Sequence, residues 1–240
     1  MNIFWYDHIL FGLLGIVIPV MSLQSKWQSE ASDIPLVLPP KRHLYFNNMF
    51  LLCIGMLLCL TAWHAGENDW ALLGFQAVNY SSTVWTSSML LIILYLSDTV
   101  YQYFSYRKDP ENLKDMENII PLSWPEYIHF IPLAIMAGIS EEIMFRGYLF
   151  HYLMSYFPDI ESGPYIVIAL ISIGFSLSHL YQGWYAVFKI FILSLLFGII
   201  YYFSESLIIV VAIHCGIDLL SGMSGVLLNA PGFPSTDEEE

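Results

Sequence analysis

Residues 185–203 read YAVFKIFILSLLFGIIYYF, a run in which Lys189 is the single charged side chain. A helix of this length rises roughly 28 Å, close to the ~30 Å hydrocarbon core of a bilayer. Backbone N–H and C=O groups in hydrocarbon must bond within the segment itself, so such a run is helical. The stretch therefore predicts a transmembrane helix.

Other apolar runs along the chain predict further spans, at 3–23, 46–65, 84–104, 124–140, 164–181 and 207–229. Segment 143–157 either continues the helix that begins at 124 or forms a short separate one. The run 3–23 has no basic region before it and no clear small-residue cleavage site, so we expect it to remain as a span. The predicted fold class is an all-α polytopic transmembrane bundle of about seven or eight helices.

Composition agrees with a membrane protein and limits its partners. Apolar residues make up 57% of the 240 positions and charged residues 12%, about half the share in soluble domains. Mean hydropathy is +0.60. The net charge of −13 argues against a nucleic-acid partner, whose phosphates it would repel. Cys53, Cys59 and Cys215 lack CxxC spacing and indicate neither a disulfide framework nor a thiolate zinc site.

The chain shows no internal repeat and no low-complexity linker, so we expect one membrane domain over 1–240. Within it, 1–123 would form peripheral helices, 124–229 a core with four helices carrying the site, and 230–240 an acidic tail. The first and third predicted loops hold most basic residues, namely Lys26, Lys41, Arg42, Arg107, Lys108 and Lys114. The positive-inside rule places those loops in the cytoplasm and the N-terminus outside. A short chain with few loops favours a prokaryotic cytoplasmic (inner) membrane.

Three short stretches place ionisable residues inside apolar surroundings: EEIMFR at 141–146, FSLSH at 175–179 and HCGID at 214–218. Each such residue costs at least ~2.5 to 3.5 kcal/mol at mid-membrane unless it is paired or hydrated. A helix puts Glu142 and Arg146 on one face, where they can form an ion pair. Glu141 is left without that partner, and it is a candidate general base facing a polar cavity.

The other two stretches supply imidazoles. His214 and Asp218 are again four residues apart, so the carboxylate can accept a proton from one ring nitrogen and fix the tautomer. His179 comes from a different helix. If the three helices meet, the set provides a base, polarising or metal-binding imidazoles, and donors for an oxyanion, which are the parts needed to hydrolyse an amide.

Plainer interpretations remain open for these residues. A Glu–Arg pair in a membrane helix can be a structural bridge, and an intramembrane His can simply be a satisfied hydrogen-bonding residue. A proton or cation transporter would also bury Glu, His and Asp, although the chain lacks repeats and paired broken helices. A third alternative is a non-catalytic membrane interaction or immunity protein.

The three stretches, in this order and on separate apolar segments, resemble the motifs of the CAAX protease and bacteriocin-processing family, related to the Rce1-type prenyl endopeptidases. The family signature reads EExxxR, FxxxH and HxxxN/D. Glu141, Glu142 and Arg146 match the first motif, Phe175 and His179 match the second, and His214 and Asp218 match the third. The resemblance covers roughly residues 124–229.

This resemblance implies an intramembrane metalloprotease that cleaves a peptide or membrane-anchored protein with an activated water. Glu141 would be the base and His179 its partner at the water. His214 and Asp218 would stabilise the oxyanion, while Glu142 and Arg146 hold the helix in register. A divalent metal such as zinc is an expected cofactor, with Glu142, His179 and His214 as candidate ligands.

The last motif position departs from the eukaryotic prenyl proteases, which have Asn there. An ionised carboxylate cannot donate to an oxyanion, so Asp218 would have to be protonated, bind a metal, or orient His214. A prenylated CAAX substrate is for this reason only one candidate. The broader expectation is processing of a peptide or membrane-anchored protein.

Overall fold

The structure is a computed structural model that describes residues 1–31, 39–108 and 119–228, and its regular elements in these ranges are all helices. Their bounds are α1 Trp5–Gly12, η1 Leu13–Val17, α2 Ile18–Ala31, α3 Lys41–Ala65, α4 Ser82–Lys108, α6 Trp124–Glu141, η3 Glu142–Leu149, α7 Phe150–Met154, α8 Gly163–Leu177, η4 Leu180–Gln182, α9 Trp184–Ser204 and α10 Leu207–Leu228. The predicted all-α bundle is confirmed. The predicted acidic tail lies outside the described residues.

Six helical segments of the described chain are long and apolar enough to cross a membrane: Trp5–Gln28, Lys41–Ala65, Ser82–Ser105, Trp124–Met154, Trp184–Ser204 and Leu207–Leu228. The protein is a multi-pass integral membrane protein. The predicted span at 164–181 is shorter than expected, because α8 ends at Leu177 after 15 residues. A helix of that length rises roughly 22 Å, less than the hydrocarbon core.

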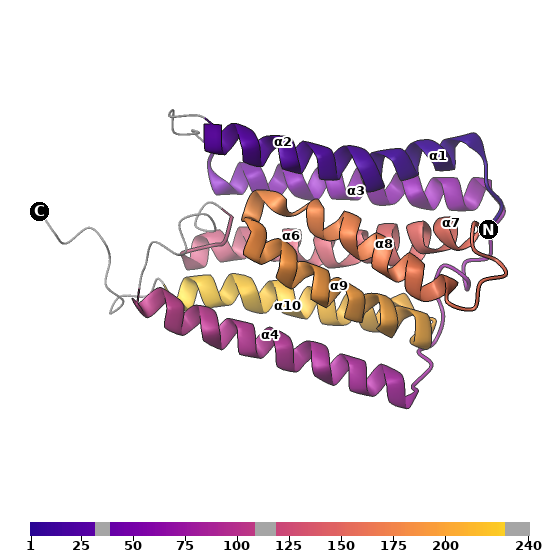
Figure 1. Cartoon of the computed structure of the whole chain (residues 1–240). Coiled ribbons are helices and arrows are strands. Elements are labelled where there is room, and N and C mark those ends of the chain that lie inside the picture. The colour runs from indigo at the N-terminus through magenta and orange to yellow at the C-terminus, as the bar shows by residue number, and fades with distance from the viewer. Residues whose placement is uncertain (32–38, 109–118, 229–240) are drawn as a thin grey trace, which may run out of the picture.

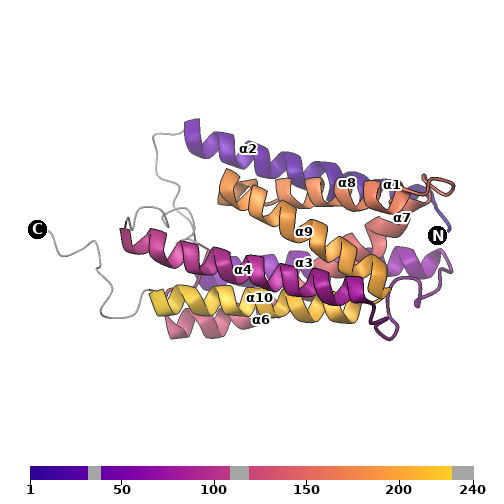
Figure 2. The ribbon, with the colours of Figure 1, turned by 60° about the horizontal axis from the view of Figure 1, so that its bottom comes forward.

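The helices run side by side along one direction (Figure 1). α1, α2 and α3 lie on one side of the bundle, α4 and α10 on the other, and α8 and α9 between them. α8 and α9 form a hairpin whose turn stops short of the ends of α2 and α10 in both views (Figures 1 and 2). Gly183 makes this turn with φ of +94°, in the left-handed region that favours glycine.

The segment that follows the predicted fourth span continues its helix to Met154. The Oγ of Ser123 accepts a hydrogen bond from the backbone N–H of Glu126, and Pro125 occupies the first turn, so α6 begins with two ordinary start signals. From Glu142 to Leu149 the helix widens to π-helical hydrogen bonding, and all eight side chains of this stretch are buried. Such wide turns occur frequently at functional sites.

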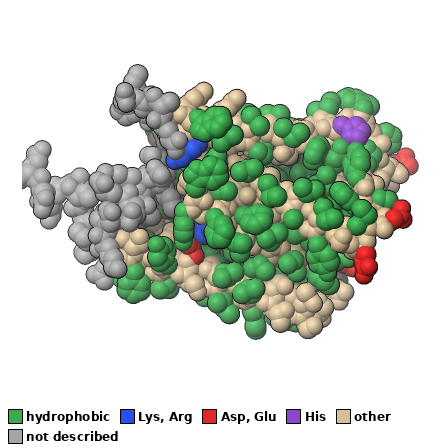
Figure 3. All heavy atoms as spheres, viewed as in Figure 1, with side chains coloured by type: hydrophobic (Ala, Val, Ile, Leu, Met, Phe, Trp, Pro, Cys, Tyr) green, Lys and Arg blue, Asp and Glu red, His purple; other side chains and the backbone are tan. Residues whose placement is uncertain are grey.

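The two ends of the bundle differ in charge. Lys26, Lys41, Arg42, Arg107 and Lys108 all belong to the end at which α2 and α4 finish and α3 begins. Acidic residues of the connections 66–81 and 155–162 belong to the opposite end, and Figure 3 shows carboxylates there beside a largely hydrophobic flank. The first and third loops are thus flanked by helix ends on one side of the bundle, as positive-inside reasoning requires. Lys114 lies outside the described residues.

Candidate active site

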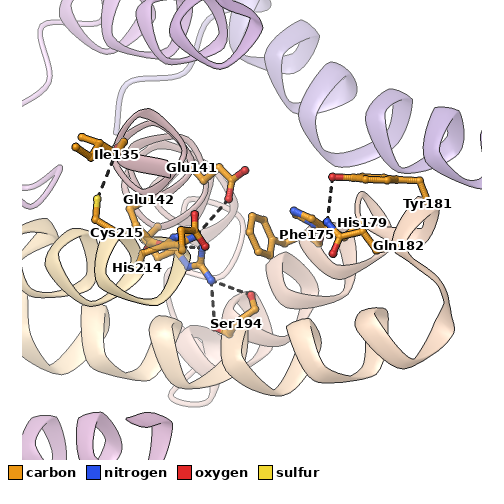
Figure 4. A network of polar contacts seen from close by, with 12 residues as sticks. Ile135, Glu141, Glu142, Phe175, His179, Tyr181, Gln182, Ser194, His214 and Cys215 are labelled. Atoms are coloured by element: carbon orange, nitrogen blue, oxygen red, sulfur yellow. Dashed lines mark hydrogen bonds and ion pairs between the residues drawn. The ribbon is translucent and has the colours of Figure 1, made fainter. Parts of the chain in front are cut away.

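Glu142 lies at the centre of a buried polar cluster, and its side chain is fully excluded from solvent. Its Oε1 accepts a hydrogen bond from Arg146 Nη1 at 3.0 Å, which confirms the predicted four-residue ion pair. The same oxygen accepts a second bond from Nδ1 of His214 at 2.7 Å. One carboxylate oxygen therefore joins the first and third motifs, which are 72 residues apart in the chain (Figure 4).

Arg146 is held by one motif residue, Phe175, and by residues that the sequence did not single out as functional. Its Nη2 donates to Oγ of Ser194 on α9 at 2.9 Å, and that hydroxyl donates in turn to Oγ of Ser172 on α8 at 3.0 Å. The guanidinium carbon lies 4.8 Å from the ring centre of Phe175 and 5.3 Å from that of Phe197. Ser194 and Phe197 lie in the largely apolar run 185–203, and no motif in that run marks them as functional.

His214 presents its two ring nitrogens to different carboxylates. With Nδ1 bonded to Glu142, Nε2 faces Oε2 of Glu141 at 3.6 Å and Oδ2 of Asp218 at 3.7 Å. The ring stacks on Phe197 with centroids 5.3 Å apart. The carboxylate hydrogen-bonded to the ring, and therefore the one that fixes the tautomer, is Glu142 and not Asp218 as the four-residue spacing predicted.

Glu141 and Asp218 flank the same ring nitrogen without a direct hydrogen bond to it. Their side chains are 15% and 29% exposed, whereas the side chain of Glu142 is fully buried. In Figure 4 the carboxylate of Glu141 lies apart from that of Glu142, on the side of the site that faces Phe175. Of the two adjacent glutamates, Glu141 is thus the one whose carboxylate is partly exposed and makes no direct hydrogen bond among the described residues, as suits a base acting on water.

His179 follows the end of α8, and its Nδ1 donates to the carbonyl oxygen of Phe175 at 2.8 Å. Its ring packs against that of Phe175, with centroids 4.8 Å apart. The ring of Phe175 also contacts Arg146, so it lies between His179 and the buried cluster (Figure 4). Within the described residues no hydrogen bond or ion pair joins His179 to Glu141, so the predicted partnership at one water is not a direct contact.

The hydrogen bond to Phe175 leaves Nε2 as the free nitrogen of His179. The residue lies in the connection between α8 and α9, outside the six candidate spans, and burial lowers its pKa from the ordinary imidazole value. The ring is therefore neutral near pH 7, with Nε2 available to accept a hydrogen bond.

The candidate metal ligands Glu142, His179 and His214 do not form a common site. Glu142 Oε1 is shared by Arg146 and His214, and His179 lies beyond Phe175. Glu142 Oε2 is buried without a hydrogen-bond partner, yet in the described parts of the chain no group of three His, Cys, Asp or Glu is placed to hold an ion. The three candidate ligands are not brought together in the described structure, and the metal stays a prediction.

A family model described as Type II CAAX prenyl endopeptidase Rce1-like matches residues 123–220. This stretch is an Rce1-like domain. The match begins at the helix-capping Ser123 and ends two residues after Asp218, so it contains all three motifs and the whole cluster described above. No curated protein and no solved structure matches the chain.

The matched stretch comprises α6 to α9 and the first part of α10. Residues 1–122 lie outside the match and contribute α1 to α4. The similarity of this stretch to the family suggests an intramembrane protease, and the buried contact between Glu142 and His214 is consistent with that activity.

Proposed function

We propose that this protein is an intramembrane peptidase that hydrolyses a peptide bond in a peptide or membrane-anchored protein. The observation that supports it best is the arrangement around His214. The ring is bonded to the buried Glu142 on one side and faces the accessible Glu141 on the other. A fixed imidazole beside a free carboxylate, at the meeting point of three helices, has the parts needed to activate water and to bind an oxyanion.

The proposed reaction uses the chain's own groups. Glu141 takes a proton from a water molecule, and the water oxygen forms a bond to the carbonyl carbon of the substrate. His214, whose Nδ1–H is bonded to Glu142, donates a second hydrogen bond from Nε2 in its protonated form to the carbonyl oxygen as that oxygen gains negative charge. The proton on Glu141 then moves to the amide nitrogen, the C–N bond breaks, and a carboxylic acid and an amine leave.

The remaining members of the cluster have supporting roles in this proposal. Glu142 and Arg146 orient His214 and hold α6 and α10 together, while His179 accepts a hydrogen bond from the water or the substrate through Nε2. Asp218 lies 3.7 Å from Nε2 of His214 and stabilises its protonated form.

The substrate class is tested with a panel of matched peptides, each made with and without a C-terminal isoprenoid thioether. The detergent-purified protein is expected to cleave at least one peptide of the panel, and His179→Ala is expected to abolish that cleavage. Preference for the lipidated member would support a prenylated CAAX-type substrate. A chelator arm tests the metal, since loss of cleavage that zinc restores would support a bound ion.

Cleavage unchanged in the His179→Ala variant would contradict the proposed site. If a folded wild-type protein cleaved no peptide of the panel, the non-catalytic interaction protein would become the better account. Proton uptake by liposomes containing the protein would favour the transporter.

A further inference from the structure

A groove of about 450 Å³ lies between the first two turns of α3 and the second and third turns of α6, outside the catalytic cluster. It is lined by Arg42, His43, Tyr45, Phe46, Asn47, Met49, Ile128, His129, Pro132 and Leu133. Pro132 and Glu141 are nine residues apart on α6, about half a turn out of phase at roughly 100° per residue. The groove therefore lies on a different face of α6 from the candidate base.

The groove changes character along its length. Arg42 and His43 belong to the first turn of α3, while Met49 lies roughly 10 Å further along the helix axis. Arg42, Phe46 and Met49 follow at i, i+4 and i+7 and share one helix face. His129 and Leu133 repeat the same order of a polar and then an apolar side chain on α6. A basic entrance thus leads to an apolar wall.

The positive charge of Arg42 at the entrance of the groove is not neutralised by Glu126, the neighbouring carboxylate. Lys41 Nζ donates to Oε2 of Glu126 at 3.0 Å and to the carbonyl oxygen of Ile120 at 2.9 Å, so Lys41 and Glu126 neutralise each other. Arg42 is exposed and makes no ion pair within the described residues. His129 uses Nδ1 to donate to the carbonyl oxygen of Pro125 at 2.7 Å, which leaves Nε2 free at the groove.

The apolar part of the groove opens toward the lipid. Phe46 is 62% exposed and Ile128 is 63% exposed, and both belong to candidate membrane spans. The groove also lies toward the basic end of the bundle, where α3 and α6 begin. The net charge of the chain is −13, but here an arginine that makes no ion pair among the described residues lies beside two histidines and attracts anions.

We propose that this groove binds an anionic phospholipid, with the phosphodiester at Arg42, His43 and His129 and an acyl chain along Phe46, Met49 and Leu133. Arginine forms paired hydrogen bonds to phosphate oxygens. Basic pockets between membrane helices at the cytoplasmic side are suited to acidic headgroups. The bound lipid would fill the groove between a helix of the N-terminal region and the first helix of the Rce1-like domain.

The test is native mass spectrometry of the full chain, released from nanodiscs of equimolar phosphatidylglycerol and phosphatidylcholine. The wild type is expected to retain phosphatidylglycerol in preference to phosphatidylcholine. Arg42→Ala should reduce that retention about fivefold, the effect of one basic residue near an anionic surface, and His129→Ala should reduce it less. Lys26→Ala is the matched control, because it removes one positive charge at the same end of the bundle without touching the groove.

Equal retention of the two lipids would overturn the proposal, as would equal losses in Arg42→Ala and Lys26→Ala. Full displacement of the lipid by inorganic phosphate would show that the apolar wall contributes nothing and would overturn it as well. A dimer mass without bound lipid would assign the groove to a second copy of the chain. The test does not use proteolysis, so its result is independent of the proposed peptidase activity.

Discussion

At the scale of single residues, Glu142 is the residue that holds the site together, and its neighbour Glu141 is the candidate base. A buried charge is costly unless it is paired, and removal of one partner from a buried pair costs about 3–5 kcal/mol. Glu142 has two partners on one oxygen, and Arg146 is further held by Ser194 and by two aromatic faces. The catalytic roles are thus divided, with Glu142 fixing geometry and Glu141 free to react.

Ser194 is predicted to be a positioning residue for Arg146. Ser194→Ala removes a buried hydrogen bond to a charged group, an interaction that contributes about 1.5–3 kcal/mol. Cleavage by this variant should fall about tenfold or more in kcat, while Ser194→Thr keeps the hydroxyl and should retain most of the activity. The rates are to be measured with a peptide that the wild type cleaves.

Ser204→Ala is the control for that substitution, because Ser204 is also fully buried on α9 but bonds only to the backbone near the helix end. It should lower thermal stability without lowering kcat. Equal kcat in Ser194→Ala and the wild type would contradict the positioning role.

The protonation of His179 gives a prediction about pH. Burial lowers its pKa, so the neutral ring persists to a pH below its ordinary value of about 6.5. If the neutral ring accepts a hydrogen bond in the reaction, cleavage should be constant near pH 7 and should fall as the ring gains a proton at lower pH. The measurement is the dependence of kcat on pH for the wild type and for His179→Gln, whose side chain does not titrate.

His179→Gln should cleave more slowly than the wild type. It should also lose the part of the decrease in kcat at low pH that protonation of His179 causes. A profile of kcat against pH for His179→Gln with the same shape as that of the wild type would assign the decrease at low pH to other groups. It would remove this role from His179.

At the scale of helices, the site exists because α6 and α10 approach each other closely. Gly138 on α6 lies against Cys215 on α10, and a Cβ built on Gly138 would stand 2.8 Å from the backbone nitrogen of Cys215. Cys215 follows His214 directly. One turn after Gly138, α6 widens into η3, which places Glu142 and Arg146 opposite His214 and Ser194. The absence of a side chain at Gly138 and the wide turn together set the spacing of the motifs.

Gly138→Ala should therefore damage the site although it changes no polar residue. The added methyl group meets backbone, which cannot rotate away, so α10 and His214 must move relative to Glu142. We expect a lower thermal unfolding midpoint and a loss of cleavage. Gly216→Ala is a suitable control, because a Cβ there meets nothing within 4 Å and alanine favours the helix. A Gly138→Ala variant as active as Gly216→Ala would contradict the close approach.

At the scale of the whole molecule, hydropathy was sufficient to predict the bundle because membrane helices must satisfy their backbone groups internally. Hydropathy did not predict the length of α8, since the apolar character of 164–181 does not reveal that the helix ends at Leu177. The ion pair of Glu142 and Arg146 followed from spacing within one helix. The bond between Glu142 and His214 and the contacts of Ser194 depend on packing between helices, which spacing does not encode.

The most direct test of the account compares Glu141→Gln with Glu142→Gln in proteoliposomes, with cleavage and thermal unfolding measured on the same samples. Glu141→Gln should abolish cleavage and leave the unfolding midpoint near that of the wild type, because this partly accessible carboxylate makes no direct hydrogen bond among the described residues. Glu142→Gln should lower the midpoint, because Arg146 and His214 lose their shared charge. Cleavage at the wild-type rate by Glu141→Gln would contradict the account.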